Sequence, residues 1–298
     1  MDEFLQLCFN GTALGARYAL VALGFVIIYR ATGVINFAQG GLVALGAYLA
    51  YALGDTATLP FLLAVIGAVL LSGLIAAGTE RVVLRRMVGQ PVFAVLMVTI
   101  GLLFILEQLV TSIWGFRALN LGDPWGVQTV DAGGVVLATK DLWTIGITAG
   151  VLAAFFAFFR FSKLGVAMRA TAFDQEAALA QGISARRVFA VSWGISGALA
   201  CLAGVTLAAG PAALTPGIGA IALVAFPAMI VGGLDSPIGA VLGGLIIGLT
   251  QALTSGYQED LFPWAGANLS QVMPYIVMVL ILLIRPYGLF GTKEVRRI

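Results

Sequence analysis

Long apolar runs dominate the chain, and short polar segments separate them. Several runs reach the roughly 18–20 apolar residues that a helix needs to cross the hydrocarbon core of a bilayer. The pattern predicts an all-α integral membrane protein, a polytopic bundle of about eight or nine transmembrane segments in a single domain, 1–298. The runs are 11–30, 34–53, 60–79, 92–114, 141–160, 188–209, 219–233, 237–256 and 271–285. The run 219–233 is short for a full crossing and is interpreted as broken or re-entrant.

The composition supports a membrane protein and excludes several functions. Hydrophobic residues make up 60% of the chain and charged residues only 10%, whereas soluble domains carry about 25% charged residues. The net charge of +2 gives no reason to expect a nucleic-acid partner. The chain has no histidine, and its two cysteines, Cys8 and Cys201, lie far apart, so neither a metal site nor any other cofactor is expected in this chain.

The positions of the basic residues predict the orientation. If the N-terminus lies outside and the nine runs alternate, all Lys and Arg except Arg17, Arg117 and Lys140 fall on the inner side. Inner loops of membrane proteins are enriched in Lys and Arg. We therefore expect an N-out, C-in topology.

The inner loop 161–187 has the pattern of a short helix with charges of both signs. Residues 166–181 are mostly good helix formers, and Gly182 stands where a glycine would end the helix. Two interpretations are open: a solvated connection, or a docking element whose small residues let another protein approach. The docking residues would be Arg169, Asp174, Glu176, Ala177, Ala178 and Gly182.

The sequence Glu176-Ala177-Ala178 followed by Gly182 resembles the coupling helix of ATP-binding cassette (ABC) importer permeases. Three further segments, 33–40, 232–244 and 284–291, extend the likeness in the same order along the chain. Together they make the chain similar to the branched-chain amino acid permease family of ABC importers. It departs from that family at Gln39, Gly41 and Asp235, where histidine, an acid and glycine are usual. These departures leave the solute open, because relatives also import urea and short amides.

The resemblance implies a particular assembly in the cytoplasmic (inner) membrane. A second related permease, or a second copy of this chain, would complete the pore, and a periplasmic or extracellular solute-binding protein would deliver the solute. Two ATPase subunits would bind ATP and Mg²⁺, so this chain itself would not be an enzyme. The 166–182 helix would transmit ATP-driven movement to the bundle, and solute would pass by alternating access.

Two amides and two glycine clusters mark a candidate pathway. Asn36 and Gln39 would share one helix face, and such amides are costly in hydrocarbon unless they face protein or water. Glycines interrupt this run and a segment in the second half, and paired interruptions point to a solute site in transporters. The alternative is that the glycines only allow close helix packing. The pathway residues are Asn36, Gln39, Gly40, Gly41, Gly232, Gly233 and Ser236.

Arg17 and Glu107 are the charged residues expected deep within predicted spans. They lie at similar predicted depth, and pairing would reduce the cost of burying each charge. The sequence thus favours an intramembrane ion pair that joins the first span to the fourth. The alternative is that Glu107 lines the route and meets the ammonium group of the solute.

The sequence gives no support to two other classes of function. A gradient-driven transporter would be expected to carry a relay of acids or histidines through its spans, and none is apparent. An intramembrane enzyme would need a nucleophile with a base, or a pair of metal-ligating acids, and no predicted span supplies them. No catalytic residue is therefore predicted.

Overall fold

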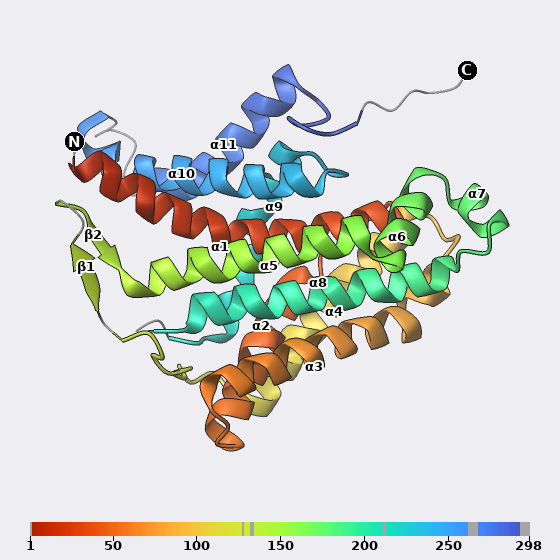
Figure 1. Cartoon of the computed structure of the whole chain (residues 1–298), viewed down its shortest axis with the longest axis horizontal. Helices are drawn as coiled ribbons and strands as arrows, with labels where there is room; N and C mark the ends of the chain where they lie inside the picture. Colours follow the sequence, from red (N-terminus) through yellow and green to blue (C-terminus); the bar gives the residue numbers. More distant parts are fainter. Residues whose placement is uncertain (1, 127, 132–133, 211–212, 262–267, 293–298) are drawn as a thin grey trace.

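The computed structural model describes residues 2–126, 128–131, 134–210, 213–261 and 268–292, and the chain is mostly helical (Figure 1). The first half contains α1 (Asp2–Thr32), α2 (Gln39–Tyr51), the π-helix η1 (Ala52–Thr56), α3 (Phe61–Val82), the 3₁₀ helix η2 (Leu84–Met87) and α4 (Val92–Trp114). Strands β1 (Thr129–Asp131) and β2 (Val136–Ala138) then precede α5 (Thr139–Phe161), α6 (Lys163–Phe173) and α7 (Gln175–Ala180). The second half contains α8 (Ala185–Ala208), the 3₁₀ helix η3 (Pro216–Ala220), α9 (Ile221–Gly232), α10 (Pro237–Leu261) and α11 (Leu269–Ile284).

Helices cover most of each predicted apolar run, except that residues 34–38 at the start of the second run are not helical, and the length of the longer helices identifies a multi-pass membrane protein. Within the described ranges, six helices are long and apolar enough to cross a bilayer. The helix 216–232 and α11 are apolar but shorter, as the short runs at these positions predicted. The membrane-protein prediction from the sequence is thus confirmed.

The burial pattern separates a protein core from a lipid-facing shell. Helix α2 is buried on nearly all sides, and α1 is buried over most of its length. Helices α3, α4 and α5 instead expose much of their surface, including Leu70, Leu74 and Phe93. Apolar exposure on this scale would be a liability in water, whereas the hydrocarbon of a bilayer accommodates it.

Small residues allow α1 and α10 to pack with their backbones almost in contact. A Cβ atom added at Gly248 would lie 2.3 Å from the backbone nitrogen of Gly15. A Cβ atom added at Gly15 would in turn lie 2.8 Å from the Cα atom of Leu245. Membrane helices associate through such close packing, because hydrocarbon supplies no hydrophobic drive between them.

The connection between α4 and α5 contains two paired β-strands, which the all-α prediction missed. Strands β1 and β2 pair antiparallel, with Val130 opposite Leu137. The side chain of Gln6 on α1 fastens the hairpin: its Nε2 donates to the Val136 carbonyl and its Oε1 accepts from the Val136 amide, both at 2.8 Å. The strands are three residues each, too short to leave a clear periodic signal in the sequence.

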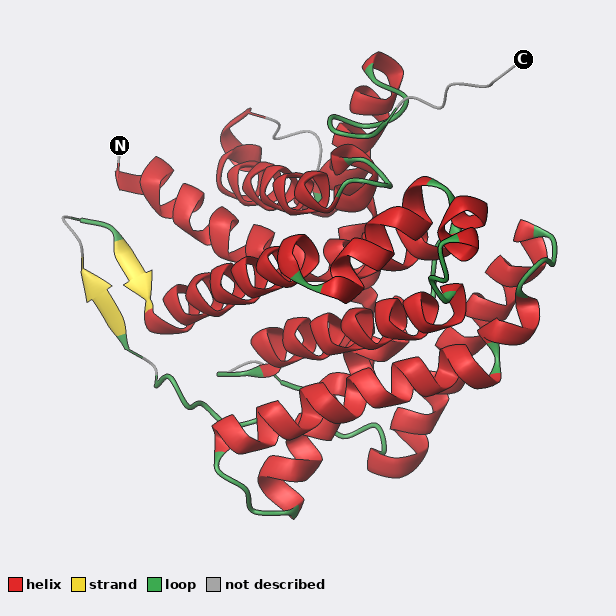
Figure 2. Cartoon of the chain, turned by 45° about the vertical axis from the view of Figure 1, so that its right-hand side comes forward, coloured by secondary structure: helices red, strands yellow, loops and turns green. Residues whose placement is uncertain are grey.

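The single helix predicted for 166–181 is wrong in one respect, because the chain breaks at Asp174. Asp174 adopts an extended conformation, and its carboxylate accepts a hydrogen bond of 2.9 Å from the Ala177 amide. This is the behaviour of an N-cap residue, so α6 ends and α7 begins here. The hairpin and the pair α6–α7 lie at opposite ends of the bundle (Figures 1 and 2).

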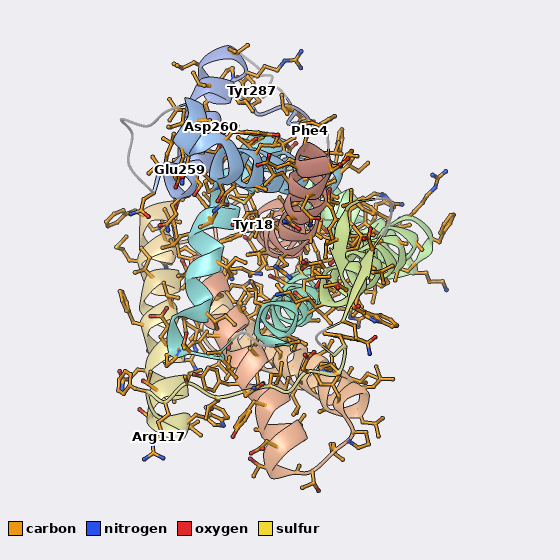
Figure 3. All side chains as sticks on the ribbon, turned by 90° about the vertical axis from the view of Figure 1, so that its left-hand side faces the viewer. Phe4, Tyr18, Arg117, Glu259, Asp260 and Tyr287 are labelled. Carbon is orange, nitrogen blue, oxygen red and sulfur yellow. The ribbon has the colours of Figure 1, made fainter. Side chains whose placement is uncertain are left out.

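Basic side chains gather at the end of the bundle that carries α6 and α7. The guanidinium groups of Arg30 and Arg169 each lie 5.4 Å from the centre of the Phe159 ring. Nearby in the fold, Arg85 donates to the Arg186 carbonyl. At the opposite end, Figure 3 shows Arg117 at the margin of the bundle and Glu259 and Asp260 on α10. The basic residues of 293–298, which entered the orientation argument, lie outside the described residues.

Candidate solute pathway and coupling site

The chain leaves helical geometry between α1 and α2 while still inside the bundle. Gly33 makes the turn with a positive φ of 72°, a conformation open to glycine at little cost. The side chain of Gln39, at the start of α2, reaches back to Gly24, about two turns before the end of α1. Segment 33–38 thus returns toward the membrane interior. Non-helical backbone at such depth is tolerated where protein or a water-filled cavity surrounds it.

Gln39 is fully buried and ties three helices together. Its Oε1 lies 2.8 Å from the hydroxyl of Ser196 on α8, and that hydroxyl lies 3.0 Å from the Gly24 carbonyl oxygen on α1. Its Nε2 has no hydrogen-bond partner among the described residues. The predicted burial of this amide against protein is therefore confirmed, and part of its hydrogen-bonding capacity remains free.

Asn36 lines a cavity and carries a buried side-chain donor that has no partner among the described residues. Its side chain is 1% exposed, its Oδ1 accepts from the Ala38 amide at 3.1 Å, and its Nδ2 has no partner in the described part of the chain. The cavity it lines measures about 210 Å³ and has largely apolar walls, including Val95, Phe189 and Trp193. A buried donor without a partner costs about 1–3 kcal/mol, so the site favours an occupant that accepts a hydrogen bond.

The same cavity extends to the end of the bundle that carries α7. Gln175 of α7 lines it, together with Gly89 and Gln90 from the connection that precedes α4. Space at the predicted coupling element is therefore continuous with space at Asn36. Neither the cavity nor its contact with α7 follows from local sequence, because α1, α3, α4, α7 and α8 all contribute to it.

Glu80 lines this cavity and was missed by the sequence analysis. Its side chain is 2% exposed and pairs with Arg85, with 2.8 Å between Oε2 and Nη2 and 3.3 Å between Oε1 and Nε. Two parallel contacts of this kind make a strong, directional carboxylate–guanidinium pair. Glu80 directly follows the third apolar run, where an acidic residue is usually an exposed loop residue. The basic residue Arg85, five positions later, was the feature of the sequence that could have indicated an ion pair.

The first break packs against η3, at the start of the run 219–233 that the sequence pattern marks as broken or re-entrant. A Cβ atom added at Gly40 would lie 2.7 Å from the Gly219 carbonyl oxygen, and one added at Gly219 would lie 2.5 Å from that of Gly40. The rings of Phe37 and Phe226 stack beside this contact, 5.9 Å apart. Gly41 packs just as closely against Leu106 of α4. The partner of the first interruption is thus η3, rather than segment 232–244.

The second predicted glycine cluster, at 232–244, packs closely against neighbouring backbone. A Cβ atom added at Gly232 would lie 2.0 Å from the Gly239 carbonyl oxygen on α10. Gly233, with a φ of 116°, lies against Gly291. Ser236 caps α10 by accepting from the Gly239 amide at 3.0 Å. These residues hold α9, α10 and the chain near 288–291 together, which is the packing alternative considered for the glycines.

The candidate docking residues divide into exposed and structural ones. Glu176 and Ala177 are exposed, whereas Ala178 is buried. Arg169 turns toward the bundle and donates to the carbonyls of Phe159 and Arg160 at the end of α5, where basic side chains stabilise a helix C-terminus.

Gly182 ends α7 as predicted. Its φ is +80°, its amide donates to the Leu179 carbonyl, and the Ile183 amide donates to the Ala178 carbonyl. These two bonds form a Schellman motif. The glycine therefore fixes where the exposed face of α7 stops.

The predicted ion pair between Arg17 and Glu107 is wrong. Arg17 pairs with Asp141 at the start of α5, with 2.8 Å between Nη2 and Oδ1. Helix α5 packs against α1, whereas Glu107 faces a groove on the outer surface of α4. Similar depth was not enough to predict pairing, because the rotation and neighbours of each helix decide which charges meet.

An interrupted helix within an apolar bundle, together with a mostly apolar cavity lined by a few polar side chains, is typical of one class of protein, that of membrane transport proteins. The family model for the permease component of branched-chain amino acid transport systems matches residues 7–282. The chain therefore belongs to that family of permeases.

Individual relatives match over almost their whole length. The high-affinity branched-chain amino acid transport system permease protein LivH of Salmonella typhimurium is 32% identical over 310 residues, covering 99% of this chain and 98% of the relative. BraD of Pseudomonas aeruginosa, described in the same terms, is 30% identical, with the same coverage. Among solved structures, PsaBC from Streptococcus pneumoniae in complex with Fab overlaps with a TM-score of 0.49 and 18% identity, covering 96% of this chain and 94% of that one.

Proposed function

We propose that the chain is the permease subunit of an ABC importer that moves branched-chain or related amino acids across the cytoplasmic (inner) membrane. Membership of the permease family supports this function, and the names of the relatives support the solute class. This chain binds no nucleotide in the proposed mechanism. ATP and Mg²⁺ bind to partner ATPase subunits, which supply the energy.

One observation carries the mechanism: a single cavity is lined both by Gln175 on α7 and by Asn36, whose buried Nδ2 has no partner among the described residues. Movement of α7, driven by the ATPases, changes the shape of the space in which a solute would lie. Asn36 supplies a polar contact there, with Gln39 buried behind it on the next turn of the chain, while the apolar walls suit an aliphatic side chain. A buried site with apolar walls and a few polar groups is typical of small-molecule binding.

The proposed topology has nine segments, with the N-terminus outside and the C-terminus inside. The gathering of Arg30, Arg85, Arg169 and Arg186 at the α6–α7 end supports an inner position for that end, because inner loops are rich in Arg and Lys. The hairpin end then faces outward, where a solute-binding protein docks. A second permease, either a related chain or another copy, completes the pore.

The docking of ATPase subunits at α7 is tested by charge reversal. Glu176→Arg in the tagged, detergent-solubilised chain is expected to abolish recovery of an ATPase subunit from native membranes, as read by mass spectrometry. The matched control is Glu259→Arg, which reverses an exposed acid at the opposite end (Figure 3) and is expected to retain the ATPase. Equal recovery with both variants, or no ATPase with the unchanged chain even after crosslinking at α7, would contradict the proposal.

The solute is tested through the partner that delivers it. The binding protein recovered with the complex is expected to bind leucine, isoleucine or valine in calorimetry. Binding of urea or a short amide instead would keep the importer mechanism and change the solute. ATP-independent uptake driven by an ion gradient would overturn the mechanism itself.

A further inference from the structure

The outward face of α4 carries polar side chains where the neighbouring surface is apolar. Glu107 is half-buried and Gln108 is exposed. Gln108 donates to Ser112 at 3.2 Å, and the Thr111 hydroxyl donates to the Gln108 carbonyl at 3.0 Å. The Glu107 carboxylate has no hydrogen bond or ion pair to any residue of the described ranges. It is thus the one group on this face that lacks a partner within the described chain.

Glu107 opens into a groove of about 590 Å³ between α4 and η3. Phe104, Ile105 and Phe116 form apolar walls, while Pro216 and Gly217 form the opposite side. The groove lies directly outside the point where the two broken helices meet. Leu106, the neighbour of Glu107, packs on Gly41, while Gly219, two residues beyond Gly217, packs on Gly40.

A carboxylate on this surface requires a polar or cationic neighbour. Ionisable groups within spans are costly against lipid, and they mark solute or ion pathways. Arg17 does not neutralise Glu107, because it pairs with Asp141. No Lys or Arg of the described ranges forms an ion pair with Glu107, so a cation that pairs with it would have to come from elsewhere. Broken helices in transporters commonly meet at the solute site, so the pathway is the place where such a charge would arrive.

We propose that Glu107 binds the ammonium group of an amino acid solute, in a half-site that the second permease subunit closes. This inference rests on the proposed function and adds the group on the solute that the permease recognises. A carboxylate pairs with an ammonium through charge-assisted hydrogen bonds, while Phe104, Ile105 and Phe116 accommodate an aliphatic side chain. The groove and the Asn36 cavity then lie on two sides of the Gly40–Gly219 contact.

The test uses the complete importer, with both permeases, the ATPases and the binding protein, in proteoliposomes supplied with radiolabelled leucine. Glu107→Gln keeps the size of the side chain and removes its charge, and it is expected to lower ATP-driven leucine uptake by at least tenfold. Glu107→Asp keeps the charge and is expected to restore much of the rate. The control Asp55→Asn neutralises an exposed acid that accepts only from Tyr51 among the described residues and is expected to leave uptake unchanged.

Assembly is measured on the same samples, by co-purification of the second permease and the ATPases. Loss of uptake with intact assembly supports the proposal. Normal uptake by Glu107→Gln overturns it, as does loss of the second permease, which would show that Glu107 pairs with that subunit rather than with solute. Failure of the proposed function would appear earlier, as absence of ATP-driven leucine uptake by the unchanged importer.

Discussion

Single buried polar groups in the centre of the bundle determine which helices can stay together. Ser196 and Ser192 lie one turn apart on α8, and both are fully buried. The single proton of the Ser196 hydroxyl lies within hydrogen-bond reach of both Gln39 Oε1 and the Gly24 carbonyl oxygen, whereas the Ser192 hydroxyl has no partner in the described structure. Removing each hydroxyl in turn therefore distinguishes the contribution of the hydrogen bond to stability from that of a buried hydroxyl group alone.

Ser196→Ala is expected to lower the free energy of unfolding by about 1–3 kcal/mol, because Gln39 Oε1 would lose its hydrogen-bond donor in a buried place. Ser192→Ala is expected to change stability little, since no hydrogen bond is lost. Thermal unfolding of the purified chain in detergent measures both. Equal losses in the two variants would show that the Ser196–Gln39 contact contributes nothing of its own.

At the scale of the elements, some helices can pack together only where a glycine leaves no side chain between their backbones. Gly40 and Gly219 bring α2 and η3 together, and each lacks room for a Cβ atom. Gly101 on α4 is different, because an added Cβ atom there would meet nothing within 4 Å. Gly40 and Gly219 therefore cannot accept a side chain, whereas Gly101 can, although all three are glycines within apolar segments.

Gly40→Ala is expected to destabilise the protein by about 1–3 kcal/mol, the usual cost of overpacking, and to reduce transport by pushing η3 away. Gly101→Ala is expected to be neutral or to stabilise by up to about 1 kcal/mol, because alanine is the better helix former. Unfolding midpoints and leucine uptake measure the two effects. Similar behaviour of both variants would contradict the close contact of α2 with η3.

At the scale of the whole molecule, orientation relates every site to a side of the membrane. Phe173 on α6 is 95% exposed, and Arg117 lies exposed at the opposite end (Figure 3). The proposed topology places Phe173 inside the cell and Arg117 outside. Cys201 is fully buried, so only Cys8 needs to be replaced before single cysteines are introduced.

In a Cys8→Ser background, Arg117→Cys is expected to react with a membrane-impermeant maleimide in intact cells. Phe173→Cys is expected to react only after the cells are permeabilised. The extent of labelling on gels measures both. The reverse pattern would invert the topology and place α7 on the wrong side for an ATPase.

The sequence by itself determined what depends on local chemistry. Apolar runs located the helices, because any helix in lipid must cover its backbone with about 20 apolar residues. Gly182 was predicted to end a helix, because a left-handed turn favours glycine whatever surrounds it. Asn36 and Gln39 were predicted to avoid lipid, and both are buried in protein. The break at Asp174 was also readable in principle, because Asp is a strong N-cap, but the helix formers on both sides concealed it.

The tertiary structure decided which distant groups meet. Arg17 pairs with Asp141, which is 124 residues away in the sequence, because α5 packs beside α1. Gly40 contacts Gly219, whereas Gly232 contacts Gly239 and allows α9 to pack closely on α10. The cavity at Asn36 likewise required walls from α1, α3, η2, α4, α7 and α8. Partner choice follows from the rotation and crossing of packed helices, and these depend on every contact in the bundle, so no local stretch of sequence specifies them.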